Sequence, residues 1–130
     1  MKIEALIPAP TVQNMDQLAH FMWADQFARQ VEIWLGDDLL ARSFDPLRVT
    51  EVNDRVLTPV IYLPASDVRV PLTASGVVTS CPIKGKAETL DWADQAGIAW
   101  RYVSAVPGAE ALLGRVGFDA ARVTVCDAPI

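Results

Sequence analysis

One short segment of the sequence combines a thiol with an ammonium group. Cys81 precedes Pro82 in the stretch SCPIKGKA, and Lys84 follows three positions after the cysteine. A neighbouring lysine favours the thiolate, which is the nucleophilic form of cysteine. Residues three apart on an extended strand point to opposite faces, so Cys81 and Lys84 meet only if the chain turns at Pro82 or Gly85. With such a turn, both side chains are candidates for catalysis or binding.

A carboxylate in the segment LRVTEV is a third candidate. Leu47, Val49 and Glu51 share one face of an expected strand because side chains alternate along a strand. A carboxylate on an apolar face is costly unless it is paired, and Lys84 is a natural partner. The other reading makes the opposite face the inward one and leaves Glu51 solvated, and the pattern leaves both readings open. The catalytic candidates are therefore Cys81, Lys84 and Glu51, with Glu51 positioning the lysine.

Aromatic side chains supply candidate walls for a pocket. Trp100 and Tyr102 fall on the same face of the strand IAWRYV, and Tyr62 lies in VIYLP. Paired aromatics most often build a core, but tyrosine and tryptophan each carry a polar tip that can line a pocket.

The chain contains few residues of the types that bind metals or cofactors. The sequence holds one histidine, His20, and two cysteines far apart, Cys81 and Cys126, so neither a zinc site nor a Cys-His dyad is favoured. The GDD stretch at residues 36–38 has the residues of a tight hairpin turn, and no glycine-rich phosphate loop accompanies it. We expect no metal and no cofactor, and we expect His20 at a surface or an interface.

Composition limits the classes of partner. The chain has 130 residues, 52% hydrophobic and 21% charged, with a net charge of -5. This is typical of one soluble domain with a real core. Its 11 basic residues are not clustered, which argues against nucleic acid, and no apolar run approaches the length of a membrane span. The N-terminus lacks the pattern of a signal peptide, so we expect no membrane contact and a cytoplasmic protein.

The elements that must position these residues are mainly strands. Short apolar runs broken by turn residues predict a hairpin over residues 31–43 and strands near 47–52, 59–63, 68–72, 77–83, 87–92, 98–103, 115–118 and 123–126. Because no helix of ten or more residues separates them, the strands should be antiparallel.

Two helices are expected besides the strands. The segment MDQLAHFMWADQFAR, after a cap at Asn14, predicts an N-terminal helix. GAEALLG, residues 108–114, predicts a short helix near the C-terminus. We therefore divide the chain into an N-terminal arm and helix, residues 1–30, containing the extended Pro8 and Pro10 segment, and a compact β domain, residues 31–127. The apolar N-terminal helix suggests a homo-oligomer interface.

The order of motifs LLARSFDPLRVTEV, PVIYLPASDVRVPL, TSCPIKGKA, AWRY, GRVGF and RVTV resembles the domain-of-unknown-function family 427. The match runs from about Val31 to Val125. The resemblance implies a small, mostly β protein with a β-tent-like fold and no established activity. Some members carry a nucleotidyltransferase label, for which this sequence offers no motif. The chain departs from the family pattern at Ile83, where an aromatic residue is usual, at Thr89, where tyrosine is typical, and in lacking a histidine before the cysteine motif.

The resemblance also implies that the candidate residues form one cluster. The family pattern includes the positions of seven residues that we take as the expected binding site: Arg48, Glu51, Tyr62, Cys81, Lys84, Trp100 and Tyr102. Three functions fit this set. The first is a binding module for a small metabolite or peptide, the second a structural or homo-oligomeric protein with a buried Glu-Lys pair, and the third a thiol-dependent enzyme using Cys81.

Overall fold

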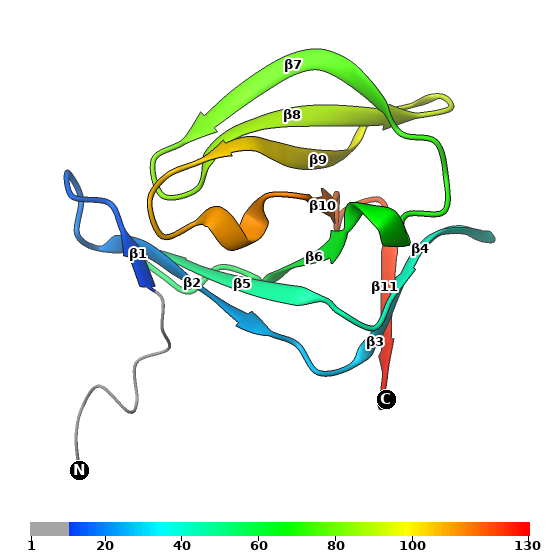
Figure 1. Cartoon of the computed structure of the whole chain (residues 1–130), viewed down its shortest axis with the longest axis horizontal. Coiled ribbons are helices and arrows are strands. Elements are labelled where there is room, and N and C mark those ends of the chain that lie inside the picture. The colour runs from blue at the N-terminus through cyan, green and yellow to red at the C-terminus, as the bar shows by residue number, and fades with distance from the viewer. Residues whose placement is uncertain (1–10) are drawn as a thin grey trace.

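The computed structural model describes residues 11–130. Within them, the chain forms two antiparallel sheets (Figure 1), one of eight strands in the order β1-β2-β5-β6-β10-β9-β8-β7 and one of three in the order β11-β3-β4. The strands are β1 (Thr11–Gln13), β2 (His20–Gln26), β3 (Gln30–Leu35), β4 (Asp38–Ser43), β5 (Leu47–Asn53), β6 (Val60–Pro64), β7 (Thr73–Cys81), β8 (Gly85–Trp92), β9 (Gln95–Ala105), β10 (Arg115–Phe118) and β11 (Thr124–Ala128). The predicted mainly β, antiparallel architecture is confirmed.

The predicted N-terminal helix is wrong. Its segment instead forms β2, which pairs with β5 along its whole length from His20↔Asn53 to Gln26↔Leu47. Polar residues are scattered through the segment and form no single face, so its sequence is compatible with a strand as well as a helix. Pairing with β5 decides between them. The Asn14 side chain accepts a hydrogen bond from the Asp16 backbone N–H at 3.0 Å, and so closes a turn rather than capping a helix. The expected Pro8 and Pro10 segment lies outside the described residues.

The predicted C-terminal helix is also wrong. Residues 108–114 contain only a three-residue 3₁₀ turn, η3 (Glu110–Leu112), whose Leu112 is fully buried. Gly108 and Gly114, with φ of 92° and 79°, adopt left-handed backbone on either side of it, which leaves too few residues for an α-helix.

One predicted strand does not form either. In the segment 68–72, Val68 makes a single bridge to Ala41 after the 3₁₀ turn η2 (Ala65–Asp67). The rest of the segment forms no strand before β7 begins at Thr73. Pro71 lies within the segment and cannot donate to a ladder. Its apolar side chains, Val68, Val70 and Leu72, still pack against the core between the two sheets.

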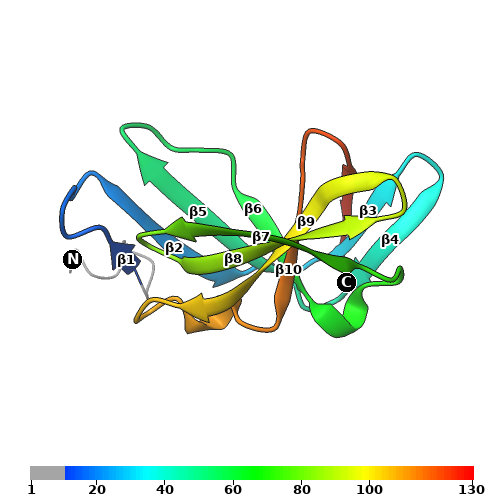
Figure 2. The same cartoon turned by 90° about the horizontal axis from the view of Figure 1, so that it is seen from above.

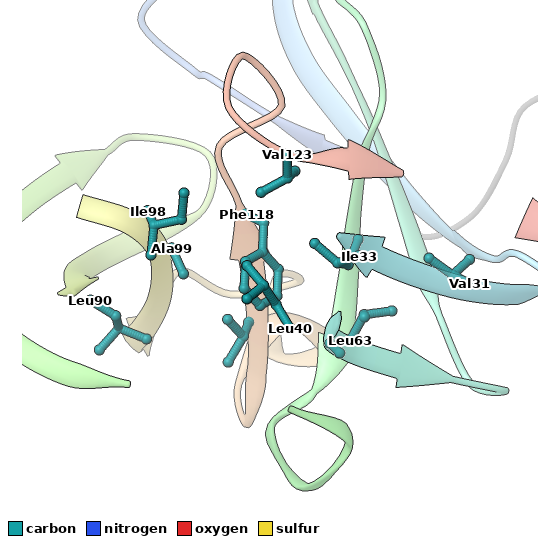
Figure 3. Close-up of a cluster of buried hydrophobic side chains, with 11 residues drawn as sticks. Val31, Ile33, Leu40, Leu63, Leu90, Ile98, Ala99, Phe118 and Val123 are labelled. Carbon is teal, nitrogen blue, oxygen red and sulfur yellow. The ribbon is translucent and has the colours of Figure 1, made fainter. Parts of the chain in front are cut away.

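Two clusters of buried side chains lie on opposite faces of the large sheet. The sheet-to-sheet core (Figure 3) joins one face of the large sheet to the small sheet and consists of Val31, Ile33, Leu40, Ala41, Leu63, Leu90, Ile98, Ala99, Val116, Phe118 and Val123. The inner core lies on the other face and consists of Val12, Met22, Val49, Tyr62, Ile83, Ala87, Tyr102, Ala109 and Leu112. The large sheet therefore packs on both faces.

The large sheet curls around the inner core. In Figure 1, β7, β8 and β9 form a layer above β2 and β5, with β6 and β10 connecting the two layers, and Figure 2 shows β7 to β9 lying across the lower strands. The proposed domain boundary at residue 30 falls at the start of β3. It separates β2, a strand of the large sheet, from β3, the first strand of the small sheet. The curl brings residues of β5 and of the β7–β8 turn within contact distance.

Candidate functional site

Glu51 lies on the inward face of β5. Val49, two residues earlier, is 2% exposed and belongs to the inner core, and Met22, the register partner of Glu51 on β2, is 1% exposed. Side chains paired across an antiparallel register share a face, so the carboxylate points the same way as these apolar groups. This settles the choice that the sequence pattern left open.

The Glu51 carboxylate is held by two side chains. Lys84 Nζ donates a hydrogen bond to Oε1, and His20 Nε2 lies 2.8 Å from Oε2. Asn14 Nδ2 lies 3.3 Å from His20 Nδ1, an arrangement that suits donation to Nδ1 and leaves the ring proton on Nε2 for Glu51. His20, which we expected at a surface or an interface, is therefore a buried member of this site.

The pairing holds both charges in place. Burial alone raises the pKa of Glu51, but the hydrogen bonds from Lys84 and His20 outweigh it and lower that pKa below its ordinary value. Burial likewise lowers the pKa of Lys84, but the hydrogen bond to Glu51 and the nearby Tyr62 outweigh it and raise that pKa. Glu51 is a carboxylate and Lys84 an ammonium at neutral pH.

A tight turn carries Lys84 inward. Lys84 N–H donates to the Cys81 carbonyl at 3.2 Å, and Val106 N–H donates to the Lys84 carbonyl at 3.0 Å. Gly85 has φ of 138°, and a Cβ built on it would lie 2.0 Å from the Ser104 carbonyl oxygen. Only glycine fits there, so the turn that the sequence required at Pro82 or Gly85 is present.

Three aromatic residues line the inner face beside this pair. Tyr62, Gly117 and Trp100 are register neighbours across β6, β10 and β9, and Thr89 of β8 continues the row. Trp100 Nε1 donates to the Tyr62 hydroxyl at 3.1 Å, with the rings edge to face at 83°. A Cβ on Gly117 would lie 2.9 Å from both rings, so the missing side chain is what lets them meet.

Tyr102 completes the aromatic wall. Its ring centroid lies 6.2 Å from that of Tyr62. Burial is the main cause that raises the pKa of Tyr62 and, more strongly, that of Tyr102. Both phenols therefore keep their protons at neutral pH, and a hydrogen bond joins the Tyr102 hydroxyl to that of Tyr62.

These side chains border an open hollow of about 310 Å³, which we call the Lys84 hollow. It is lined by Val60, Tyr62, Thr79, Lys84, Ala87, Thr89, Trp100 and Tyr102. Four of the seven expected binding residues line it, and a fifth, Glu51, accepts a hydrogen bond from the Lys84 ammonium. Lys84 is the one charged side chain among its lining residues.

The other two expected residues, Arg48 and Cys81, do not line the Lys84 hollow, although Cys81 packs against the inner core. Arg48 points away from Glu51 along β5 and donates to both carboxylate oxygens of Asp25, at 3.1 and 2.5 Å, with its guanidinium 5.3 Å from the Phe27 ring centroid. Cys81 is half-buried and lines a neighbouring hollow of about 420 Å³ together with Lys86, Ser104 and other residues of the β7–β8 turn. The sequence analysis grouped both residues with the others because strand pattern and family resemblance indicate which segments lie near one another. They do not indicate toward which hollow a side chain points.

Sequence reasoning missed His20, Thr79, Thr89 and Gly117 as site residues. A strand reading of residues 20–26 places His20 and Met22 on one face, which is the signal that would have found the histidine. The role of Gly117 depends on its pairing with Tyr62 on one side and Trp100 on the other, and this pairing cannot be predicted from the local sequence.

Within residues 11–130, no group of three or more His, Cys, Asp or Glu side chains is arranged to hold a metal ion. No helix in the described part of the chain is long and apolar enough to cross a membrane.

Comparison with known protein families matches residues 23–128 to the family described as Domain of unknown function (DUF427). A search of curated proteins found no match. Because the family match covers most of the chain, the protein belongs to this family.

Proposed function

We propose that this member of the family is a binding module whose ligand site is the Lys84 hollow. The observation that carries the proposal is the register row that gathers Tyr62, Trp100 and Thr89 on one face, beside a lysine delivered by a tight turn. Ligand sites combine apolar and aromatic walls with a few convergent polar groups, and they range over ~300–1,000 Å³. The Lys84 hollow matches the small end of that range, so the ligand is a small metabolite.

The hollow holds hydrogen-bonding capacity that the fold does not need. An ammonium has three N–H donors, and in the described part of the chain Lys84 Nζ donates one hydrogen bond, to Glu51. Every fully buried side-chain nitrogen and oxygen within residues 11–130 has a partner. The fold is thus complete without a ligand, while Lys84 keeps donors at the edge of the hollow.

A structural role is the second candidate, favoured by the burial of the Glu51–Lys84 pair. The Lys84 side chain is 10% exposed and that of Glu51 is 20% exposed, and their bond joins β5 to the β7–β8 turn. Because no N-terminal helix forms, this role does not include the homo-oligomer interface expected of that helix. The thiol-enzyme alternative is supported by the electrostatic interaction between Cys81 and Lys84, but the two side chains line different hollows.

The experiment is a screen of small fragments by saturation-transfer NMR with a blocking variant. Thr79 is exposed and lines the Lys84 hollow, whereas its neighbour Val78 is exposed and pairs with Glu88 on the opposite face. Thr79→Trp should fill the hollow and abolish the signals of fragments that bind there. Val78→Trp, the matched control, should keep them. If Thr79→Trp displaces no fragment that the native protein binds, the proposal is wrong and the structural role is preferred.

A further inference from the structure

The charge and the donors of the Lys84 hollow indicate what kind of ligand it takes. Lys84, Tyr62 and Thr79 carry N–H or O–H groups in the lining, and no carboxylate is among the lining residues. The Thr89 hydroxyl is bonded to Ser75, and the Tyr102 hydroxyl to Tyr62. The ammonium supplies the single formal charge of the lining, and the Glu51 carboxylate that binds it is not among the lining residues. A site built this way favours a ligand that accepts hydrogen bonds and carries negative charge.

The Tyr62 hydroxyl, on a buried side chain, can donate one hydrogen bond as well as accept. Its oxygen accepts the Trp100 indole N–H at 3.1 Å, so the phenolic hydrogen is directed away from that donor. Tyr62 lies close enough to Lys84 for the two to interact electrostatically. An acceptor group entering the hollow therefore meets two donors, the Lys84 ammonium and the Tyr62 O–H, and a carboxylate has two oxygens to receive them.

The lining also limits the charge and the shape of the ligand. Phosphate groups are usually bound by several cations or by a run of backbone N–H groups at a helix N-terminus or a glycine-rich loop, and the lining offers one lysine on strand-and-turn structure. A single ammonium suits a monoanion. The rings of Tyr62, Trp100 and Tyr102 suit a flat apolar body.

We propose that the Lys84 hollow binds a small aromatic monocarboxylate, with its carboxylate accepting hydrogen bonds from Lys84 and Tyr62 and its ring against Trp100 and Tyr102. This inference rests on the proposed function and names the ligand class of the same site. His20 acts as a positioning residue, because its bond to the second oxygen of Glu51 fixes the carboxylate that orients the ammonium.

The test compares benzoate with its neutral isostere benzamide, each titrated into the full-length protein and followed by NMR. Benzoate should bind at least tenfold more tightly than benzamide. Lys84→Met should remove that preference, whereas Lys86→Met should preserve it. Lys86 is the matched control because it is an exposed lysine on the same hairpin that lines the other hollow. Should Lys84→Met fail to fold, Glu51→Gln/Lys84→Met removes both charges together, and the comparison of the two probes on the native protein needs no variant.

The outcomes separate this inference from the function on which it rests. Equal binding of benzoate and benzamide, or tighter binding of phenyl phosphate than of benzoate, overturns the monocarboxylate while the binding module stands. The monocarboxylate is overturned in the same way if neither probe binds but Thr79→Trp still displaces neutral fragments. If Thr79→Trp displaces no fragment at all, both proposals fail.

Discussion

At the scale of single residues, the site depends on a carboxylate placed on an apolar face. Glu51 shares that face with Val49, and its two oxygens are bound by Lys84 and His20. Removing one partner of a buried pair leaves the other charge without compensation, which costs more than the pair itself contributes. The pair therefore makes the inward orientation of each partner depend on the other.

Glu51→Gln should lower the free energy of unfolding by about 2–3 kcal/mol, less than the ~3–5 kcal/mol of a fully buried pair because the site is partly exposed. Urea denaturation measures the loss. Glu88→Gln is the control, since its partner Arg101 is 50% exposed whereas Lys84 is 10% exposed, and it should cost at most about 1 kcal/mol. Glu51→Met/Lys84→Met should recover much of the loss, because it leaves no unpaired charge. Equal losses for Glu51→Gln and Glu88→Gln would show that the pair is not buried in solution.

The lowered pKa of Glu51 predicts a difference in acid stability. A carboxyl whose pKa is lower in the folded chain contributes stability above its ordinary value of 4.5, and this is lost as the pH falls through the folded value. The native protein should therefore lose more stability than Glu51→Gln between pH 7 and about pH 3. Asp119, whose pKa Arg122 also lowers, contributes to both proteins and cancels in the difference. Parallel stability curves for the two proteins would contradict the pairing.

At this scale the sequence predicted which side chains lie close together. Glu51, Lys84, Trp100, Tyr102 and Tyr62 were found because strand alternation and the turn at Pro82 or Gly85 are local properties of the chain. Arg48 and Cys81 do not line the Lys84 hollow, and His20 was missed, because the face that a side chain takes and its distant partners are set by the register between strands.

At the scale of elements, the β7–β8 turn and the N-terminal hairpin position the site. The turn was predictable from Pro82 and Gly85, since both residues restrict the backbone locally. The helix predicted for residues 15–29 was wrong because the segment has no single polar face that would distinguish a helical from a strand periodicity. Its strand form is stabilised by pairing with β5, which is distant in the sequence. Local sequence signals were therefore enough to predict the turn. The structure of the N-terminal segment is determined by tertiary contacts, which the sequence alone does not reveal.

Gly85→Ala should be the most damaging glycine substitution in this hairpin. The added Cβ would lie 2.0 Å from the Ser104 backbone oxygen, so β9 must move, and we expect a loss above ~3 kcal/mol in urea denaturation. Gly36→Ala is the matched control, since Gly36 also has positive φ, at 58°, but nothing lies within 4 Å of a Cβ there. It should cost about 1 kcal/mol. A small loss for Gly85→Ala would mean that the turn is not held as close to β9 as the structure shows.

At the scale of the whole molecule, one curled sheet separates two cores. The sheet-to-sheet core and the inner core share the strands β6, β8 and β9, because different residues of these strands enter opposite clusters, as Leu63 and Tyr62 do on β6. Strand content and antiparallel pairing followed from the sequence. The curl and the two-sided packing did not, since they arise from long-range pairing and twist.

Because the two cores share strands, they should unfold together. In a urea titration followed by NMR, the amide signals of β2, at the inner core, and of β3, at the sheet-to-sheet core, should disappear with the same midpoint. Loss of the β2 signals at a lower urea concentration than the β3 signals would show that the N-terminal hairpin is an independent unit and that His20 does not secure it.

The most direct measurement of the proposed function is a chemical-shift map of the strongest-binding fragment on the ¹⁵N-labelled protein. Trp100 is the reporter of choice, because its indole N–H donates to Tyr62 at the wall of the Lys84 hollow. The largest shifts should fall on this indole signal and on the backbone amides of Lys84 and Thr89, and should saturate with fragment concentration. Shifts centred instead on the hollow beside Cys81 and Ser104, or on the one between Leu72 and Arg115, would contradict the assignment of the Lys84 hollow as the binding site.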